Sequence, residues 1–215
     1  MTKPLTLSES LYDQIADALA QDGCIILPNF LPDEMTHQLT QYVGDLPKQQ
    51  FKAAGIGRND ERQLKQQVRN DTTRWLSNDS IAEQNYLAVM EECRHQLNQR
   101  LYLGLFDYEA HFAHYAQGNY YQRHIDAFQG QSNRVVTTVF YLNPNWSEED
   151  AGELLIYSPN SDEILHRVLP KFGTMVIFLS DRFPHEVLAA KQDRYSIAGW
   201  FRTNNSNSQT IDPLS

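Results

Sequence analysis

The sequence has few cysteines and little positive charge, and each shortage excludes a class of protein. Cys24 and Cys93 are the only cysteines in 215 residues, too few for a disulfide framework or a cysteine-based zinc site. We interpret them as buried thiols of a reducing compartment. The 18 Lys and Arg residues oppose 27 Asp and Glu residues, which gives a net charge of −9. Such a chain lacks the cationic surface that general binding to nucleic acid or anionic membranes requires.

Long hydrophobic runs, internal repeats and low-complexity linkers are also absent. No run approaches the length of a membrane span, and the N-terminal residues MTKPLTLSES contain no apolar core of a signal peptide. We therefore expect a cytoplasmic protein without nucleic-acid or membrane partners. Residues 1–203 are expected to form a single domain and the polar tail 204–215 to be disordered. The lack of an unassigned amphipathic helix or long apolar edge strand favours a monomer.

The first half of the chain has helical periodicity. Apolar residues at helical spacing follow Ser8, which can cap the helix, and Gly23 ends it. The apolar run 24–27 predicts a short buried strand. Further helices are expected to begin near Pro32 and Ser80, so that the helical part extends over about residues 5–102.

The second half consists of short apolar segments separated by turn residues, which predicts a series of strands. The predicted strands span residues 111–116, 120–124, 134–142, 153–157, 174–179, 185–188 and 195–201. Helices followed by many short strands favour an α+β chain. Its core, at about residues 105–202, would be a β-sandwich or jelly roll buttressed by the helices.

The segment 51–75 differs in charge from the rest of the chain. Its six basic and three acidic residues give it a local charge of +3, and Gly55 and Gly57 allow a flexible backbone. One interpretation is a solvated surface loop. The other is a mobile arm that recognises an acidic partner, because loops carry recognition and local charge steers encounter.

One polar pattern in the β half indicates chemistry. His124 and Asp126 are two residues apart, so that on a strand both side chains project to the same side. His185 is a third candidate. Two imidazoles and one carboxylate can hold Fe(II) on one face and leave the opposite positions open for reactants. A His-x-Asp pair by itself also arises by chance, as a surface pair or a hydrogen-bonded core pair.

Arg194 strengthens the iron interpretation. It opens the apolar strand 195–201, where a guanidinium needs an anion and a carboxylate satisfies it best. A cosubstrate that chelates iron at one end and carries a carboxylate at the other would match this arrangement. 2-Oxoglutarate is such a molecule.

The order His124-x-Asp126, His185 and Arg194 resembles the Fe(II)- and 2-oxoglutarate-dependent dioxygenases. It is most similar to the prolyl 4-hydroxylases of the oxygen-sensing type, which act on hypoxia-inducible factor, and to their bacterial counterparts. The resemblance covers about residues 50–202 and implies a double-stranded β-helix (jelly roll) core. The matching segments include Arg69–Trp75, Tyr121–Asp126, Arg134–Thr137, Gly152–Leu155, Pro184–Val187 and Arg194–Tyr195.

The resemblance implies a role for each matching residue. His124, Asp126 and His185 would bind Fe(II) and form the catalytic centre. Arg194 would pair with the distal carboxylate of 2-oxoglutarate. Four further residues would complete the cosubstrate site: Tyr141, Tyr115, Leu155 and Trp200. Without the motif, the aromatic residues among them would be read as core residues of a β-sandwich.

The resemblance also makes segment 51–75 a mobile substrate loop, with Arg69, Asp71 and Trp75 near its end. Arg134 would pair with Asp71 and tie this loop to the barrel, although the two residues could equally form an ordinary surface ion pair. The sequence departs from the family where Ala198 and Gly199 replace bulkier residues on the cosubstrate strand.

Two other histidines do not support a metal site. His111 and His114 are three residues apart on a predicted strand, so they face opposite ways.

The implied reaction is hydroxylation at C4 of a prolyl residue in a protein partner. 2-Oxoglutarate and O2 would be consumed, succinate and CO2 released, and ascorbate would serve as reductant. A bacterial-type cytoplasmic member would act on a component of translation. Two alternatives stay open. One is an oxygenase of the same fold acting on a small molecule or another side chain, and the other is a non-catalytic module that binds metal or 2-oxoglutarate.

Overall fold

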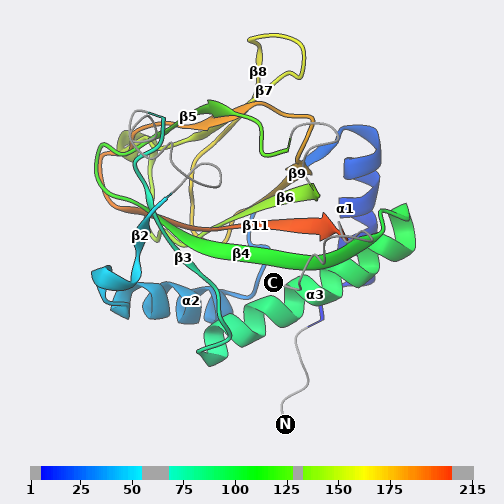
Figure 1. Ribbon diagram of the computed structural model, residues 1–215, viewed down its shortest axis with the longest axis horizontal. Helices are drawn as coiled ribbons and strands as arrows, with labels where there is room; N and C mark the ends of the chain where they lie inside the picture. Colours follow the sequence, from blue (N-terminus) through cyan, green and yellow to red (C-terminus); the bar gives the residue numbers. More distant parts are fainter. Residues whose placement is uncertain (1–5, 55–67, 128–132, 205–215) are drawn as a thin grey trace, which may run out of the picture.

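The computed structural model describes residues 6–54, 68–127 and 133–204, which form two antiparallel sheets and three α-helices (Figure 1). The helices are α1 (Glu9–Gln21), α2 (Asp33–Asp45) and α3 (Ile81–Leu101), with short 3-10 turns at Lys48–Gln50 and Glu148–Asp150. Within these ranges, no helix is long and apolar enough to cross a membrane.

The larger sheet has seven strands and the smaller one four. In spatial order the larger sheet contains β1 (Cys24–Leu27), β9 (Met175–Leu179), β6 (Arg134–Tyr141), β11 (Arg194–Thr203), β4 (Leu105–Tyr115), β3 (Thr72–Trp75) and β2 (Lys52–Ala53). The smaller sheet contains β5 (Tyr121–His124), β10 (His185–Val187), β7 (Leu154–Tyr157) and β8 (Ile164–Val168). This arrangement confirms the expected jelly-roll core.

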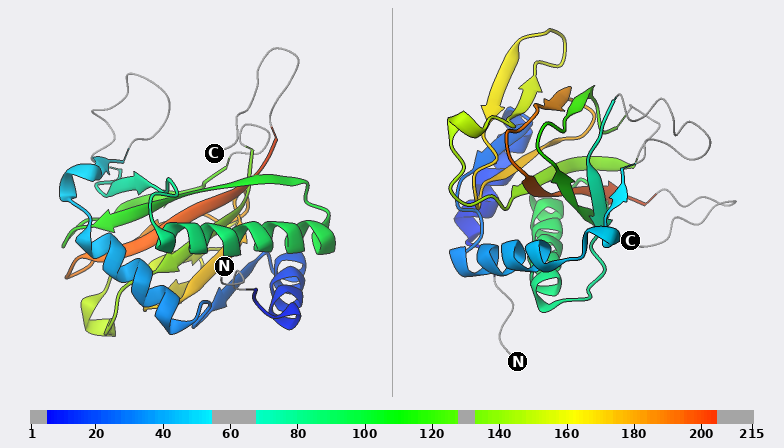
Figure 2. Two further views of the ribbon diagram at one scale, coloured as in Figure 1. Left: turned by 90° about the horizontal axis from the view of Figure 1, so that it is seen from below. Right: turned by 90° about the vertical axis from the view of Figure 1, so that its left-hand side faces the viewer.

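The predicted helix starts are present, and side-chain caps define two of them. The hydroxyl of Ser8 accepts a hydrogen bond from the backbone N–H of Leu11, and the hydroxyl of Ser80 accepts one from that of Glu83. Helix α3 packs against β4, and α1 and α2 pack against α3. Figure 2 shows the three helices on one side of the larger sheet. The helices therefore cover one face of this sheet and leave the other face to the smaller sheet.

Strand alternation separates an apolar core from a polar pocket. On β4, β6 and β11, alternate residues such as Phe112, Phe140 and Ile197 are fully buried in the core beneath the helices. The intervening residues face the smaller sheet and line a pocket. Three adjacent strands thus supply both the hydrophobic core and the site.

Three strands were not predicted from the sequence. Strand β8 carries exposed Ile164 and Leu165 side by side, so it lacks the alternation that marks a half-buried strand. Strands β2 and β3 border the predicted substrate loop. The centre of that loop, residues 55–67, and residues 205–215 of the predicted disordered tail lie outside the described residues.

The structure gives a steric reason for the glycine at position 199, where the family that the sequence resembles has a bulkier residue. A Cβ at this position would lie 2.5 Å from Cζ of Tyr108. The Tyr108 hydroxyl is in turn held by Thr138 (2.8 Å) and Tyr86 (3.2 Å). The ring of Tyr108 occupies the volume that a larger residue would fill on β11.

We therefore predict that Gly199→Ala lowers the free energy of unfolding by about 1–3 kcal/mol through overpacking. Gly44→Ala is the matched control. Gly44 lies in α2, where an added Cβ would meet no atom of another part of the protein within 4 Å. Alanine there should stabilise the protein by about 0.5–1 kcal/mol because it limits the freedom of the unfolded chain. Urea denaturation of both variants measures this, and equal effects would contradict the steric explanation.

Candidate active site

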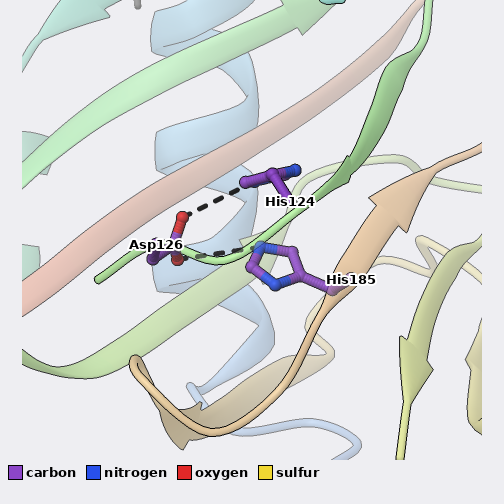
Figure 3. Close-up of side chains that lie close together, drawn as sticks. All are labelled: His124, Asp126 and His185. Carbon is purple, nitrogen blue, oxygen red and sulfur yellow. Dashed lines mark ion pairs between the residues drawn. The ribbon is translucent and has the colours of Figure 1, made fainter. Parts of the chain in front are cut away.

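The pocket between the two sheets brings His124, Asp126 and His185 together (Figure 3). His124 ends β5 and lies directly opposite His185 at the start of β10. Nε2 of His124 is 3.5 Å from Oδ1 of Asp126, and Nε2 of His185 is 3.7 Å from Oδ2. One potential ligand atom from each residue lies within 4.8 Å of the others. Strand pairing thus supplies the two imidazoles, and the turn after β5 supplies the carboxylate.

The hydrogen bonds of the two histidines orient their free nitrogens. Nδ1 of His124 donates to the carbonyl of Gln122 (2.8 Å), and Nδ1 of His185 donates to that of Phe183 (3.0 Å). A protonated Nδ1 leaves a lone pair on Nε2, the atom that faces Asp126. Burial and the nearby His124 lower the pKa of His185 to about 4, so this imidazole is neutral near pH 7.

Asp126 is the anionic member of the triad. Burial acts to raise its pKa, but His185, His124 and the Trp200 hydrogen bond outweigh burial and lower the pKa below its ordinary value. Oδ2 accepts hydrogen bonds from Thr137 Oγ1 (2.8 Å) and from Trp200 Nε1 (3.0 Å). Two imidazole nitrogens with an ionised, oriented carboxylate fit Fe(II).

Arg194 lies in the same pocket, fully buried on β11. Its guanidinium carbon is 5.1 Å from the ring centroid of Tyr115 and 5.0 Å from that of Tyr141. Nε donates to the carbonyl of Gly152 (3.0 Å), but Nη2 has no hydrogen-bond partner among the described residues, and neither has the Tyr141 hydroxyl. Burial raises the pKa of Tyr141 to about 12, so its hydroxyl remains a donor. Two buried donors without acceptors fit a carboxylate.

The sequence-based assignment of Leu155 is wrong by one residue. Leu154 lines the pocket, together with Val187, its partner across the β7–β10 pair. Leu155 is buried on the opposite face of β7, where it pairs with Glu186. A shift of one position along a strand moves a side chain to the other face.

The expected pair between Asp71 and Arg134 is also wrong, because each side chain has another partner. Arg69 makes two hydrogen bonds to the Asp71 carboxylate (2.7 and 2.5 Å). Arg134 donates to Oε1 of Glu109 (2.9 and 2.8 Å). The Arg134 guanidinium also lies 3.6 Å from the Trp200 ring centroid. β4 and β6 both flank β11, which brings Glu109 to Arg134 across one strand.

Trp200 and Thr137 both donate hydrogen bonds to Asp126, a role that the sequence did not reveal for either residue. Trp200 lines the pocket on the same side of β11 as Arg194, and its indole N–H also donates to the Asp126 carboxylate. Thr137 ends the matching segment Arg134–Thr137, but no role was assigned to it. Its hydroxyl is 2.9 Å from that of Ser180.

His111 is a pocket residue that the sequence analysis missed. As expected, His114 faces the other side of β4, where it stacks on Tyr195. The His111 ring contacts Trp200 (5.4 Å between centroids) and the half-exposed Trp75 (5.1 Å). Its Nδ1 is buried without a hydrogen-bond partner in the described parts of the chain. Burial, together with Arg69 and Arg134, lowers the pKa of His111 to about 3. Its alternation with Tyr115 could have placed it in the pocket.

Comparison with known proteins agrees with this geometry. The profile of the 2OG-Fe(II) oxygenase superfamily matches residues 110–202. A prolyl-4-hydroxylase from Pseudomonas putida is 34% identical, with a TM-score of 0.81, and the match covers 90% of this chain and 100% of that one. The chain belongs to the 2OG-Fe(II) oxygenase superfamily.

Two further proteins are similar to this chain. The Trichoplax adhaerens enzyme, solved with a peptide of the oxygen degradation domain of hypoxia inducible factor, is 29% identical over 90% of each chain, with a TM-score of 0.81. Human Egl nine homolog 1 is 27% identical over 93% of this chain. The chain spans about half the length of that protein (48%). The superfamily that the profile describes is named for its use of 2-oxoglutarate and Fe(II).

The hydrogen bonds to Asp126 lead to a prediction about metal affinity. Trp200→Phe and Thr137→Val each remove one donor to Oδ2 and should weaken Co(II) binding about 10- to 100-fold, the usual effect of losing a group that orients a ligand. Titration of the metal-depleted protein, followed by the Co(II) absorption bands, measures this. Unchanged affinity in both variants would show that the triad is oriented without these donors.

The buried neutral imidazole of His111 predicts a pH-dependent stability. Its folded pKa of about 3 lies below the value near 6.5 of the unfolded chain. Below pH 6.5 only the unfolded state binds the proton, so the free energy of unfolding should fall with decreasing pH, by up to about 1.4 kcal/mol per pH unit from this group. Metal-free His111→Leu should lose that part of the slope. Urea titrations between pH 8 and 4.5 that give the same slope for both proteins would contradict this prediction.

Proposed function

We propose that this protein is an Fe(II)- and 2-oxoglutarate-dependent dioxygenase that hydroxylates C4 of a prolyl residue in another protein. The substrate C–H bond, 2-oxoglutarate and O2 would yield the C–OH product, succinate and CO2. One observation carries the proposal. A single pocket holds the His124, Asp126 and His185 triad as well as the unpaired donors of Arg194 and Tyr141. A ligand that chelates a metal and ends in a second carboxylate satisfies both groups.

The residues of the pocket have separate tasks in this reaction. His124, Asp126 and His185 would hold the iron, which together with 2-oxoglutarate supplies the oxidising chemistry when bound. Arg194 and Tyr141 would fix the distal carboxylate and thereby the orientation of the cosubstrate. The buried walls, which include Leu154 and Val187, exclude water from the reacting groups.

A protein substrate is supported by the aromatic wall of the pocket, which we define as Trp75, His111 and Trp200. The three rings contact one another in series, and Trp75 is 51% exposed. Aromatic-lined grooves bind proline-containing segments, because the extended proline conformation is preformed and packs against flat rings. The P. putida and T. adhaerens relatives are prolyl hydroxylases by name, which also supports a prolyl substrate.

The target, the reductant and the oligomeric state complete the proposal. A cytoplasmic translation component as the target follows from the resemblance to bacterial-type members. Ascorbate as reductant follows from the family's use of Fe(II). A monomeric enzyme is favoured by the sequence, as argued above.

The test uses lysate from cells that lack this protein. We expect that purified protein with Fe(II), 2-oxoglutarate and ascorbate adds one oxygen to proline in one dominant tryptic peptide, detected by mass spectrometry. His124→Ala, which removes a metal ligand, should abolish the modification.

The outcomes separate the proposal from its alternatives. Succinate formation without any modified proline would favour a small molecule or another side chain as substrate. Binding of Co(II) and 2-oxoglutarate without succinate formation would favour a non-catalytic module. If proline is still modified by the His124→Ala protein, the assignment of the triad as the iron-binding site is wrong.

A further inference from the structure

The ring of Tyr121 lies against the ring of His124. Their centroids are 3.5 Å apart and their planes are inclined by 14°, so the tyrosine covers one face of the imidazole. A ligand ring that is covered on one face cannot turn freely about its Cβ–Cγ bond. Tyr121 is therefore in a position to fix the direction of the His124 Nε2 lone pair.

The second face of Tyr121 is covered by Arg69. The guanidinium carbon of Arg69 is 4.3 Å from the Tyr121 ring centroid. The imidazole of His124 lies directly over the ring at 3.5 Å, so both groups cannot share one face. The order of groups is therefore Arg69, Tyr121, His124. A cation over an aromatic face is attracted by the negative potential of that face.

Arg69 is itself held by a buried carboxylate. Asp71 is 2% exposed, and both of its oxygens accept hydrogen bonds from Arg69. Paired, planar contacts of this kind restrict the guanidinium to one plane. The Asp71 carboxylate thus determines where the cation sits on Tyr121.

The backbone sets this contact. The N–H of Gln122 donates to the carbonyl of Val68 (2.8 Å), and the N–H of Asn70 donates to the carbonyl of Tyr120 (3.3 Å). These bonds place Arg69 directly opposite Tyr121 in an antiparallel bridge. The segment around Arg69 is therefore attached to the strand that carries the metal ligand.

The other two ligands have their own supports. His185 has 6% side-chain exposure and is packed edge-on against Phe178 (4.9 Å between centroids). Asp126 is held by Thr137 and Trp200. His124 has the most exposed side chain of the triad, at 16%, and its Nδ1 bond to Gln122 lies at the surface. The support that His124 lacks from burial comes from Tyr121.

We propose that Tyr121 is a positioning residue for the metal ligand His124, and that the Arg69–Asp71 pair positions Tyr121. The inference deepens the proposed function, since it rests on the same metal centre. The contribution of Tyr121 comes from the face of its ring and not from its hydroxyl.

The test is a Co(II) titration of the metal-depleted full-length protein, in which both affinity and the visible absorption bands are recorded. Tyr121→Leu should weaken Co(II) binding about tenfold or more and alter the bands, as loss of an orienting group does. Tyr121→Phe keeps the ring and should stay within about twofold of the wild type by the same reasoning. Arg69→Gln should fall between the two.

Tyr195→Leu is the matched control. Tyr195 also stacks on a histidine, His114, with centroids 4.5 Å apart and planes inclined by 11°, but that histidine is not part of the triad. Its loss should lower the melting temperature by a similar amount and leave Co(II) affinity and absorption bands unchanged.

Each outcome decides the question. Wild-type affinity and bands in Tyr121→Leu would overturn the positioning role. If Tyr121→Leu fails to fold, Arg69→Gln and Tyr121→Phe decide, and identical weakening in these two variants would assign the effect to the hydroxyl and overturn the proposal. Failure of the wild type to bind Co(II) would overturn the proposed function itself, and the positioning role with it.

Discussion

The carboxylate of Asp126 is ionised although its side chain is only 8% exposed, and much of the site follows from this constraint. A buried charge is tolerated only when charge or hydrogen bonds compensate it. The Thr137 and Trp200 donors meet part of that need in the described structure. A bound divalent cation would compensate the charge more fully. The same groups that make the buried anion tolerable therefore fix its direction toward the metal position.

The strands of the larger sheet make this constraint compatible with a stable fold. Their core-facing residues, such as Phe112 and Phe140, are fully buried beneath the helices. The opposite face can then carry polar groups such as Thr137 and Arg194 without weakening the core. Unpaired donors in the pocket destabilise the ligand-free protein, since each buried unsatisfied group costs about 1–3 kcal/mol. The unpaired donors in the pocket thus lower the stability of the fold, and the apolar residues on the other face of the same strands offset that loss.

Local signals in the sequence were sufficient where one residue acts through its own chemistry. The capping hydroxyls of Ser8 and Ser80 fix the starts of α1 and α3. The order of histidines, Asp126 and Arg194 indicates an iron and 2-oxoglutarate site. Local sequence signals did not predict those contacts that depend on which side chains are neighbours in space. The resemblance implied Leu155, but Leu154 lines the pocket, because a shift of one position along a strand moves the side chain to the other face.

By itself, then, the sequence determined the helices, most of the strands, the candidate triad of His124, Asp126 and His185, and the buried cation of Arg194. These depend on side-chain chemistry and on periodicity, both of which are local. Only the tertiary structure decided the partners of Asp71 and Arg134, the place of His111 in the pocket wall and the stack of Tyr121 on His124. Those contacts join strands that are distant in the chain. Their register and twist bring particular side chains within a few ångströms, and no local pattern encodes that distance.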